Sequence, residues 1–356
     1  MKKQILVTGG AGNIGSHTVL ALLENGYEPI IFDNFSNSNG AVIDRLALIS
    51  GARIPVVTGD CCCLIDLQMV FKCFPNISGV IHFAAHKSVA ESVANPMKYY
   101  SNNIVSLTNV MKLCRDHLIR NIVFSSSAAV YGESDQSPIV ETQGMGKPAS
   151  PYALTKQFGE RVLEMAVEGG DGIKALGLRY FNPVGAHPSG LIGEDPLGPP
   201  ANLVPVLMDA VTGRRPSLQV FGTDYDTRDG SCIRDYLHVS DLADAHVCAL
   251  NHLFQTSETN YWNVFNIGTG RGSTVFEIIE AFEAVTNMKV PILPAGRREG
   301  DLREVYADVT KAKTILGWKA SRSLALALED GWRWHLQAQN GTTVPERGNG
   351  GNVSVA

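Results

Sequence analysis

Tyr152 and Lys156 lie four residues apart in the stretch SPYALTK, residues 150–156. That spacing is close to one helical turn, so on a helix the two side chains share a face. Ordinary pKa values of about 10 for the phenol and about 10.4 for the ammonium leave both groups protonated at neutral pH. An isolated Tyr-x-x-x-Lys pair is most often a solvated helix face. The case for chemistry therefore depends on what the rest of the chain places around the pair.

A glycine-rich stretch, VTGGAGNIGSH at residues 7–17, follows the first run of β-branched residues. Its glycines satisfy G-x-G-x-x-G, which permits a tight turn and a close approach of the backbone to a pyrophosphate. The helix that follows directs its free N–H groups at the phosphates. Between a strand and a helix this pattern predicts a dinucleotide site, with these residues at the cofactor: Gly9, Gly12, Asn13, Ile14 and Gly15.

Asp33 ends the second β-branched run, in IIFDN. At this distance behind the glycines a carboxylate accepts hydrogen bonds from an adenine ribose and repels a 2′-phosphate. The sequence therefore predicts NAD rather than NADP as the cofactor. Asp60, in VTGD after the third run, fits a contact to the adenine.

The elements that position these residues alternate along the first half of the chain. Runs of β-branched residues predict strands at 5–8, 28–32, 54–58, 79–83 and 121–125. Amphipathic stretches predict helices at 16–25, 41–50, 64–74 and 96–117. This alternation is typical of an α/β protein with a doubly wound parallel sheet, the Rossmann fold. The strands are apolar almost throughout, as expected where helices cover both faces.

The second half changes character at about residue 182. Residues 182–205 are rich in Pro and Gly and predict an extended, ordered loop, and strands are predicted at 218–221 and 290–293. A helix at 239–253 and a strand at 264–267 are expected to return to the first sheet. We expect an NAD-binding domain at 1–181 that regains 239–268, and a smaller interleaved α/β substrate domain at 182–336. Residues 337–356 are expected to form a disordered tail.

The composition restricts the partners of the chain. Of its 356 residues 44% are apolar and 18% are charged, with a net charge of −5. This balance is typical of a globular protein and gives no electrostatic case for nucleic acid or an anionic membrane. No apolar run reaches the roughly 20 residues of a membrane helix, and the N-terminus enters a strand pattern without a signal peptide. The cysteines have no regular spacing, so we expect free thiols, a cytoplasmic location and no metal site, even at Cys61–Cys63.

Three serines close the fifth predicted strand in FSSSAAVYG, residues 124–132, and the third of them is Ser127. Together with Tyr152 and Lys156, and behind a dinucleotide motif, Ser127 resembles the catalytic set of the extended short-chain dehydrogenase/reductase superfamily. The resemblance implies that Lys156 holds the nicotinamide ribose and, with the positive nicotinamide ring, lowers the pKa of Tyr152. The phenol then serves as a base near neutral pH, while Ser127 hydrogen-bonds the reacting oxygen.

Five further stretches resemble the UDP-glucose 4-epimerase family: 82–103, 178–190, 199–207, 229–246 and 297–308. The likeness extends from Lys3 to about His335. It implies that the cofactor is also bound by Asn34, Asn37, Ser38, Asp60, Cys61, Phe83, Ala84, Ala85, Lys87, Asn102 and Tyr180, beside Tyr152 and Lys156. It implies that a UDP-sugar is bound by Lys87, Ser127, Tyr152, Asn182, Asn202, Leu203, Phe221, Arg234, Arg298, Asp301 and Val305. Two guanidinium groups suit a diphosphate, and a phenyl ring suits uracil.

The family resemblance also implies a reaction. Tyr152 would take the proton of the sugar C4 hydroxyl while NAD takes the hydride, and the 4-keto sugar would turn before the hydride returns to its other face. In this family a tyrosine at the position of Val305 goes with plain hexoses, whereas a small residue leaves room for an N-acetyl group. We therefore expect action on UDP-GlcNAc and UDP-GalNAc as well as UDP-Glc and UDP-Gal, unless Tyr306 closes the gap. The family is usually homodimeric through helices near 96–117 and 152–167.

Three alternatives remain open at this stage. A nucleotide-sugar 4,6-dehydratase would carry an Asp-Glu pair after the serine strand, where this chain has Ala128 and Ala129. A dehydrogenase with exchangeable NAD would form NADH in net amounts. A non-catalytic NAD-binding regulator has no need of the serine, tyrosine and lysine.

Overall fold

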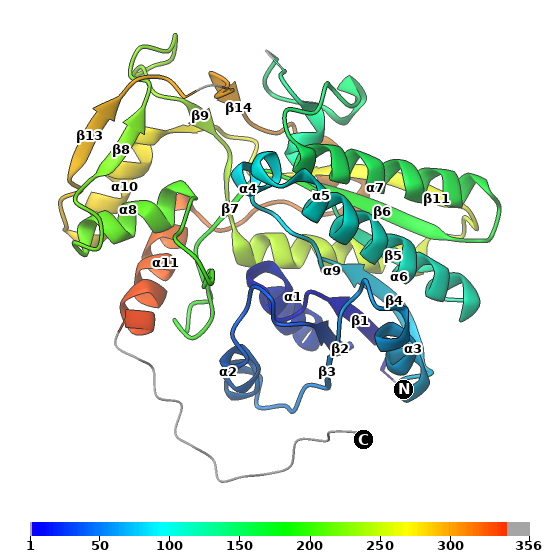
Figure 1. Cartoon of the computed structure of the whole chain (residues 1–356). Helices are drawn as coiled ribbons and strands as arrows, with labels where there is room; N and C mark the ends of the chain where they lie inside the picture. The colour runs from blue at the N-terminus through cyan, green and yellow to red at the C-terminus, as the bar shows by residue number, and fades with distance from the viewer. Residues whose placement is uncertain (1, 135, 299, 340–356) are drawn as a thin grey trace.

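A computed structural model of the chain describes residues 2–134, 136–298 and 300–339. Its largest feature is a seven-stranded, wholly parallel sheet in the order β11-β6-β5-β4-β1-β2-β3 (Figure 1). Its strands are β1 Gln4–Thr8, β2 Glu28–Asp33, β3 Val56–Thr58, β4 Ile77–His82, β5 Asn121–Ser125, β6 Lys174–Tyr180 and β11 Tyr261–Ile267. The strand order reverses between β1 and β4, so the sheet is doubly wound. The predicted α/β Rossmann fold is confirmed.

Helices cover both faces of this sheet because alternate strand residues point to opposite sides. Ile5 and Val7 pack into a core with α1 Asn13–Glu24, α2 Ala41–Ser50 and α9 Val239–Gln255. Leu6 enters the opposite core with α3 Leu64–Cys73, α6 Val105–Asp116 and α7 Pro151–Glu168. Burial on both faces explains why the strands are apolar almost throughout.

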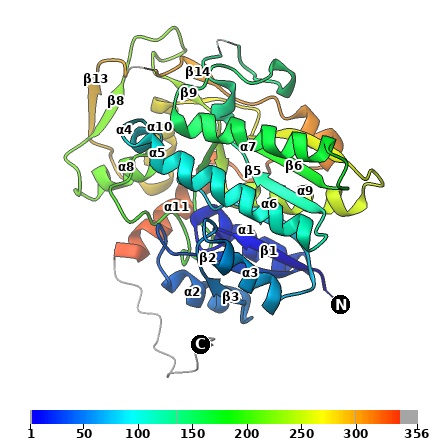
Figure 2. The same cartoon turned by 45° about the vertical axis from the view of Figure 1, so that its right-hand side comes forward.

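The predicted helix at 96–117 is interrupted. It consists of α5 Pro96–Tyr99, a π-helical turn at Tyr100–Ile104 and α6, and a short helix, α4 Val89–Ala94, precedes it. A π-helical turn inside an α-helix is frequent at functional sites. Figures 1 and 2 show α6 and α7 running alongside one another on one face of the molecule.

The second half of the chain builds three small sheets, which pair β7 with β10, β8 with β13, and β9 with both β12 and β14. Its elements are β7 Asn182–Val184, α8 Leu203–Val211, β8 Leu218–Phe221, β9 Ile233–Arg234, β10 Tyr236–His238, β12 Ser273–Thr274, α10 Val275–Thr286, β13 Ile292–Ala295, β14 Glu304–Val305 and α11 Leu324–Gln339. A separate apolar core joins α8, α10 and β8. Among them, α8, α10, β8 and β13 gather at one end of the molecule in both views (Figures 1 and 2).

Two predicted boundaries can be compared with the structure. The stretch at 239–268 contributes α9 and β11, and β11 pairs with β6 of the large sheet. Helix α11 continues to Gln339, so the tail predicted from 337 begins too early, because Gln337, Ala338 and Gln339 are good helix formers. The rest of that predicted tail, 340–356, lies outside the described residues. Within the described part of the chain, no helix has the length and apolar character to cross a membrane.

Candidate active site

Helix α7 presents Tyr152 and Lys156 on one buried face. Ser150 caps the helix by accepting a hydrogen bond from the Ala153 N–H (3.1 Å), and this fixes Tyr152 in the first turn. Tyr152 is 8% exposed and Lys156 is 4% exposed. The Lys156 Nζ donates to the Ser125 carbonyl (2.6 Å) at the end of β5 and lies 5.8 Å from the centre of the Tyr152 ring. The pair is therefore a buried part of the sheet edge and not a solvated helix face.

Burial moves the pKa values of these two groups in opposite directions. It raises the pKa of Tyr152, and a hydrogen bond with Ser127 offsets the rise only in part. Burial lowers the pKa of Lys156 to about 8, against the opposing effect of the Glu160 carboxylate. The Ser127 hydroxyl also accepts from the Ala129 N–H (3.2 Å), which starts a short 3₁₀ turn at Ala128–Tyr131. Ser127, Tyr152 and Lys156 thus lie together at the carboxyl edge of β5.

A buried ion pair beneath this set was missed by the sequence reasoning. Glu160, one turn after Lys156, binds Arg179 of β6 through both carboxylate oxygens (2.6 and 2.9 Å) and accepts from the Ser126 hydroxyl. Glu160 is 1% exposed and Arg179 is 4% exposed. The pair ties α7 to the serine strand. The glutamate four residues after the lysine indicates only a Lys–Glu pair on one helix, so no local signal points to Arg179.

Asn103, in the π-helical turn, was also missed. Its Oδ1 accepts from the His86 N–H (2.8 Å), and its Nδ2 donates to the His86 carbonyl and to the Thr155 hydroxyl (both 3.0 Å). It therefore fixes the loop after β4 against α7, beside the predicted cofactor residue Asn102. An asparagine within a helical pattern is the available signal, because this residue disfavours helix interiors.

The glycine-rich turn has the shape of a dinucleotide cradle. Gly9 has a positive φ of 69°, and a Cβ there would lie 2.8 Å from the Ala84 N. A Cβ on Gly15 would lie 2.2 Å from the Gly9 carbonyl oxygen, so both positions require glycine. Helix α1 begins at Asn13 with Gly12 as its cap and Ile14 in its first turn, and no side chain caps it. The Asn13 Oδ1 is buried without a hydrogen-bond partner among the described residues. The free N–H groups fit the phosphate end of NAD. The Asn13 oxygen can only accept a hydrogen bond, so it suits a hydroxyl group of the cofactor and not a phosphate.

Asp33 lies directly beside this turn. Its carboxylate accepts from the Ala11 N–H (3.0 Å) and the Phe35 N–H (2.8 Å), and Ser38 lies at 3.5 Å. Burial raises the Asp33 pKa, and these hydrogen bonds oppose that rise. A carboxylate held here has the donor requirement of ribose hydroxyls. Asn37 is exposed on the same loop, and its side chain forms no hydrogen bond or ion pair with a described residue.

The predicted adenine-side residues form a second group. Asn34 donates to the Asp60 carboxylate (3.2 Å), which also accepts from the Cys62 N–H (2.7 Å). Cys61 is buried, and the Cys62 thiol lies 3.5 Å from the Asn102 carbonyl oxygen. All seven cysteines have free thiols. No cluster of side chains suited to a metal ion is found in the described ranges.

The nicotinamide-side residues line the other end of the cradle. The Phe83 N–H donates to the Thr8 carbonyl (3.0 Å), and this places the partly buried Ala84 and Ala85 next to the glycine turn. The Tyr180 hydroxyl bonds the hydroxyl of Ser125 (2.6 Å), the last residue of β5. Tyr180 thereby joins the cofactor residues to the catalytic set.

Four predicted uridine-side residues form one cluster in the second half of the chain. Asp301 pairs with Arg298 (3.0 Å) and with Arg234 (3.5 Å), and the Arg298 guanidinium lies 5.2 Å from the centre of the Phe221 ring. The Arg234 Nη1 also donates to the Leu302 carbonyl (2.8 Å). The cluster brings two cationic groups, one carboxylate and one aromatic face together, as a uridine diphosphate requires.

Lys87 connects the two halves of the site. Its Nζ donates to the Glu194 carboxylate (2.9 Å), which also accepts from the Asn202 amide (3.0 Å). Asn202 immediately precedes α8, whose first residue is Leu203, and Asn182 opens β7. Glu194 is therefore a further residue of the site that the sequence reasoning did not identify. An acidic residue within a Pro- and Gly-rich loop is the only sequence signal.

Val305 joins the catalytic set to the uridine-side cluster. Its strand β14 pairs with β9, with Val305 opposite Arg234, and its side chain packs in a cluster with Ala128 and Tyr131. Tyr306 points elsewhere, because a Cβ on Gly272 would lie 3.2 Å from the Tyr306 ring. Successive side chains of a strand face opposite sides, so Tyr306 does not fill the space beside Val305.

Comparison with known proteins places this arrangement among nucleotide-sugar enzymes. Residues 5–268 match the NAD dependent epimerase/dehydratase family. The chain is 45% identical over 342 residues to a UDP-glucose 4-epimerase of Neisseria meningitidis, covering 95% of this chain and 99% of that protein. It is 45% identical over 334 residues to UDP-glucose 4-epimerase 3 of Oryza sativa, covering 93% and 89%. The bifunctional protein GAL10 of Pachysolen tannophilus is 46% identical over 334 residues, but the chain spans only 48% of its length.

Solved structures give the same result. A UDP-glucose 4-epimerase of Stenotrophomonas maltophila with bound NAD and formylated UDP-arabinopyranose has a TM-score of 0.91 at 40% identity, covering 95% of this chain and 99% of that one. A Bifidobacterium longum UDP-glucose 4-epimerase with NAD⁺ and UDP has a TM-score of 0.89 at 41% identity, covering 95% and 100%. A UDP-Glc/GlcNAc 4-epimerase of Campylobacter jejuni has a TM-score of 0.82 at 35% identity, covering 94% and 99%.

Proposed function

Because this chain belongs to the NAD-dependent epimerase/dehydratase family, as one of its UDP-glucose 4-epimerases, we propose that it inverts C4 of UDP-hexoses through a transient 4-keto sugar. The observation that carries the proposal is the buried set of Ser127, Tyr152 and Lys156 beside a cradle that fits NAD. When bound, NAD accepts the C4 hydride and returns it, and its positive ring lowers the pKa of the nearby phenol.

Each catalytic side chain has a distinct task in this proposal. Tyr152 takes the proton of the C4 hydroxyl as C4 becomes a carbonyl, and gives the same proton back when C4 is reduced from its other face. Ser127, whose hydroxyl lowers the pKa of Tyr152, holds the C4 oxygen in both directions. Lys156 contributes its charge at the cofactor ribose, fixed by the Ser125 carbonyl. Protons and hydride balance over the cycle, so the product is an isomer of the substrate.

The uridine-side cluster holds the part of the substrate that does not react. Arg234 and Arg298 bind the diphosphate, Phe221 lies against the uracil, and Asp301 accepts from a ribose hydroxyl. The keto sugar turns about its bonds to this fixed diphosphate and presents its other face. Anchoring one end while the other end turns is what an epimerase requires and a dehydrogenase does not.

We also propose that the enzyme acts on UDP-GlcNAc and UDP-GalNAc. Val305 has no ring or hydroxyl, and the side chain of Tyr306 lies beside Gly272 instead of filling the space. A valine at this position leaves room for an N-acetyl group that a tyrosine at position 305 would exclude sterically. The likeness to an epimerase of UDP-Glc and UDP-GlcNAc supports this breadth.

An assay with four sugars tests the proposal. Purified protein is incubated separately with UDP-Gal, UDP-Glc, UDP-GalNAc and UDP-GlcNAc, and the products are separated by anion-exchange chromatography. We expect each sugar to yield its C4 epimer. Conversion of UDP-Gal without conversion of UDP-GalNAc would refute the N-acetyl activity, whereas no conversion of any sugar would refute the proposed function itself.

We further propose a homodimer built on α5, α6 and α7. Large apolar side chains are exposed on these helices, including Met97 (65%), Phe158 (43%) and Met165 (63%). Exposed apolar groups that gather on one face are typical of a protein interface. The cytoplasmic location stays a prediction from the cysteine content.

A further inference from the structure

We propose that Glu194 is a positioning residue of the sugar site. Its carboxylate keeps the side chains of Lys87 and Asn202 at the hexose end of the substrate. The inference rests on the proposed function, since it assigns a role within the UDP-sugar site. It gives a role in that function to the Glu194 carboxylate, which lies on a loop that contains none of the proposed catalytic residues.

The contacts of the carboxylate support this role. One oxygen, Glu194 Oε1, accepts both from the Lys87 Nζ (2.9 Å) and from the Asn202 Nδ2 (3.0 Å). Lys87 comes from the loop after β4 and Asn202 from the residue before α8, so a single atom bridges the cofactor half and the uridine half. The Glu194 side chain is 16% exposed, whereas the Lys87 side chain is 52% exposed. The more buried carboxylate therefore determines where the mobile ammonium group lies.

The Glu194 backbone is held firmly enough to do so. The Trp334 Nε1 of α11 donates to the Glu194 carbonyl (3.2 Å). A Cβ on Gly193 would lie 2.5 Å from the Trp334 ring, so only a glycine allows the loop to approach this closely. Ile192, two residues before Glu194, is 1% exposed in the main core.

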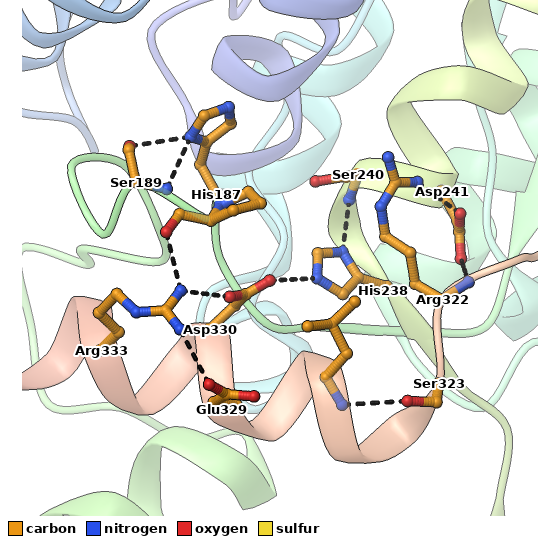
Figure 3. A network of polar contacts seen from close by, with 12 residues as sticks. His187, Ser189, His238, Ser240, Asp241, Arg322, Ser323, Glu329, Asp330 and Arg333 are labelled. Carbon is orange, nitrogen blue, oxygen red and sulfur yellow. Dashed lines mark hydrogen bonds and ion pairs between the residues drawn. The ribbon is translucent and has the colours of Figure 1, made fainter.

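A buried polar network fixes the start of the same loop. Figure 3 shows Asp330 of α11 between His238 and Arg333. The Arg333 guanidinium donates to Asp330 (2.5 Å) and to the Pro188 carbonyl (2.8 Å), and His238 lies 3.3 Å from Asp330. The loop from 188 to 194 is thus attached to α11 at both ends.

Charge explains why a carboxylate is placed here. Arg234 and Arg298 already provide two guanidinium groups for the diphosphate. An unpaired lysine ammonium is a strong point charge on a flexible stem, and a nearby diphosphate would attract it away from the sugar. The Glu194 carboxylate offsets that attraction. Lys87 and Asn202 then remain at the hexose end, where they orient C4 toward Tyr152.

A double-mutant cycle between Glu194 and Lys87 tests the inference. In Glu194→Gln the shape is kept and the charge is lost, so we expect kcat on UDP-Gal to fall roughly tenfold through misplacement of the sugar. UDP, which lacks the hexose, should bind no more weakly than to the wild type. In a Lys87→Met background the same substitution should lower kcat less than twofold further, because the group it acts through is gone.

Glu283→Gln is the matched control. Glu283 is similarly buried (21% exposed) and also pairs with an exposed lysine, Lys289, but it lies on α10. It should change kcat less than twofold. Glu194→Asp keeps the charge and shortens the side chain, so it should also lower kcat. This variant tests the inference if Glu194→Gln does not fold.

The outcomes are distinct. An equal loss of kcat in both Lys87 backgrounds, an unchanged kcat in both Glu194 variants, or a UDP affinity that falls with kcat would each overturn the inference. A wild-type protein that converts no UDP-hexose would instead overturn the proposed function.

Discussion

Tyr152 and Lys156 gain their chemistry from burial at the sheet edge. Burial disfavours a charge on either group, so it raises the pKa of the phenol and lowers that of the ammonium to about 8. The protein supplies position and a serine hydrogen bond, and the remaining activation of the phenol requires a positive charge in the cradle. In the proposed mechanism, Tyr152 therefore acts as a base only with the cofactor in place.

Removal of the phenol hydroxyl should abolish turnover without emptying the cofactor site. We expect Tyr152→Phe to lower kcat on UDP-Gal about a thousandfold, within the range for loss of a general base. NAD released from the denatured variant, measured by chromatography, should match the wild type in amount. A variant that retains more than a tenth of the wild-type kcat would remove Tyr152 from the mechanism.

Val305 offers a test of selectivity at the same scale. Val305→Tyr should lower kcat/KM on UDP-GalNAc by about a hundredfold, because a ring fills the space for the N-acetyl group, while UDP-Gal stays within about threefold. Val285→Tyr, at an exposed site on α10, should leave both values unchanged. A parallel loss on both sugars would mean that Val305 shapes the site without selecting the substrate.

Local sequence patterns predicted some of these site residues but not others. Asp33 and the glycines could be assigned because their spacing along the chain matches a known local geometry. Glu194 could not, since its partner Lys87 is 107 residues away and only the fold brings them together. Arg179 could not be assigned from local sequence either, because its role depends on β6 lying beside β5.

At the scale of elements, the Glu160–Arg179 pair fixes α7 on the sheet. The two side chains are almost fully buried and share three hydrogen bonds, and Arg179 also donates to the Tyr131 hydroxyl (3.0 Å). Tyr131 in turn donates to Asn266 of β11 (2.6 Å). The network therefore connects helix α7 to strands β6 and β11.

Breaking this buried pair should destabilise the protein strongly. Arg179→Met leaves the Glu160 charge without its partner, and we expect the free energy of unfolding to fall by about 3–5 kcal/mol in chemical denaturation. Arg161→Met, which removes an exposed pair with Glu164 on the same helix, should cost less than about 1 kcal/mol. Similar losses in the two variants would contradict the role given to the buried pair.

Elements with a clear local pattern were predictable, and the shortest strands were not. The helix at 41–50 and the strands at 121–125 and 218–221 match the structure at both ends, because each carries its own apolar period. Strands β9, β12 and β14 have two residues each and exist only through pairing across the chain. The π-helical turn also escaped prediction, since no residue type marks it.

At the scale of the whole molecule, the exposed apolar face of α5, α6 and α7 predicts self-association. Phe158→Asp places a charge on the α7 part of this face and should shift the protein from dimer to monomer in light scattering coupled to size exclusion. Ile65→Asp, on the exposed side of α3, should leave the mass unchanged. A wild-type mass of one chain, or no shift in Phe158→Asp, would contradict this interface.

Acid sensitivity is a second property of the whole molecule. Burial lowers the pKa of His17 and His82 to about 3 and that of His246 to about 4. In the unfolded chain these rings bind protons near a pKa of about 6.5. The unfolded state therefore holds more protons below that pH, and the free energy of unfolding should fall as the pH drops from about 6.5 to about 4.

Urea denaturation at two pH values measures this effect. Each ring should contribute about 1 kcal/mol between pH 6.5 and 5.5, so the three together predict a loss of roughly 3 kcal/mol. His246→Gln, which cannot titrate, should reduce that loss by about a third. Equal stability at the two pH values would show that these rings are not buried as neutral groups.

The most direct test of the central claim follows the hydrogen on C4. Purified protein is incubated with UDP-galactose in D₂O without added cofactor, and the sugars are observed by NMR while absorbance reports NADH. We predict that UDP-glucose forms with protium retained at C4 and with no net NADH, because the hydride leaves and returns within one active site. Deuterium at C4, or NADH that accumulates with turnover, would contradict the account.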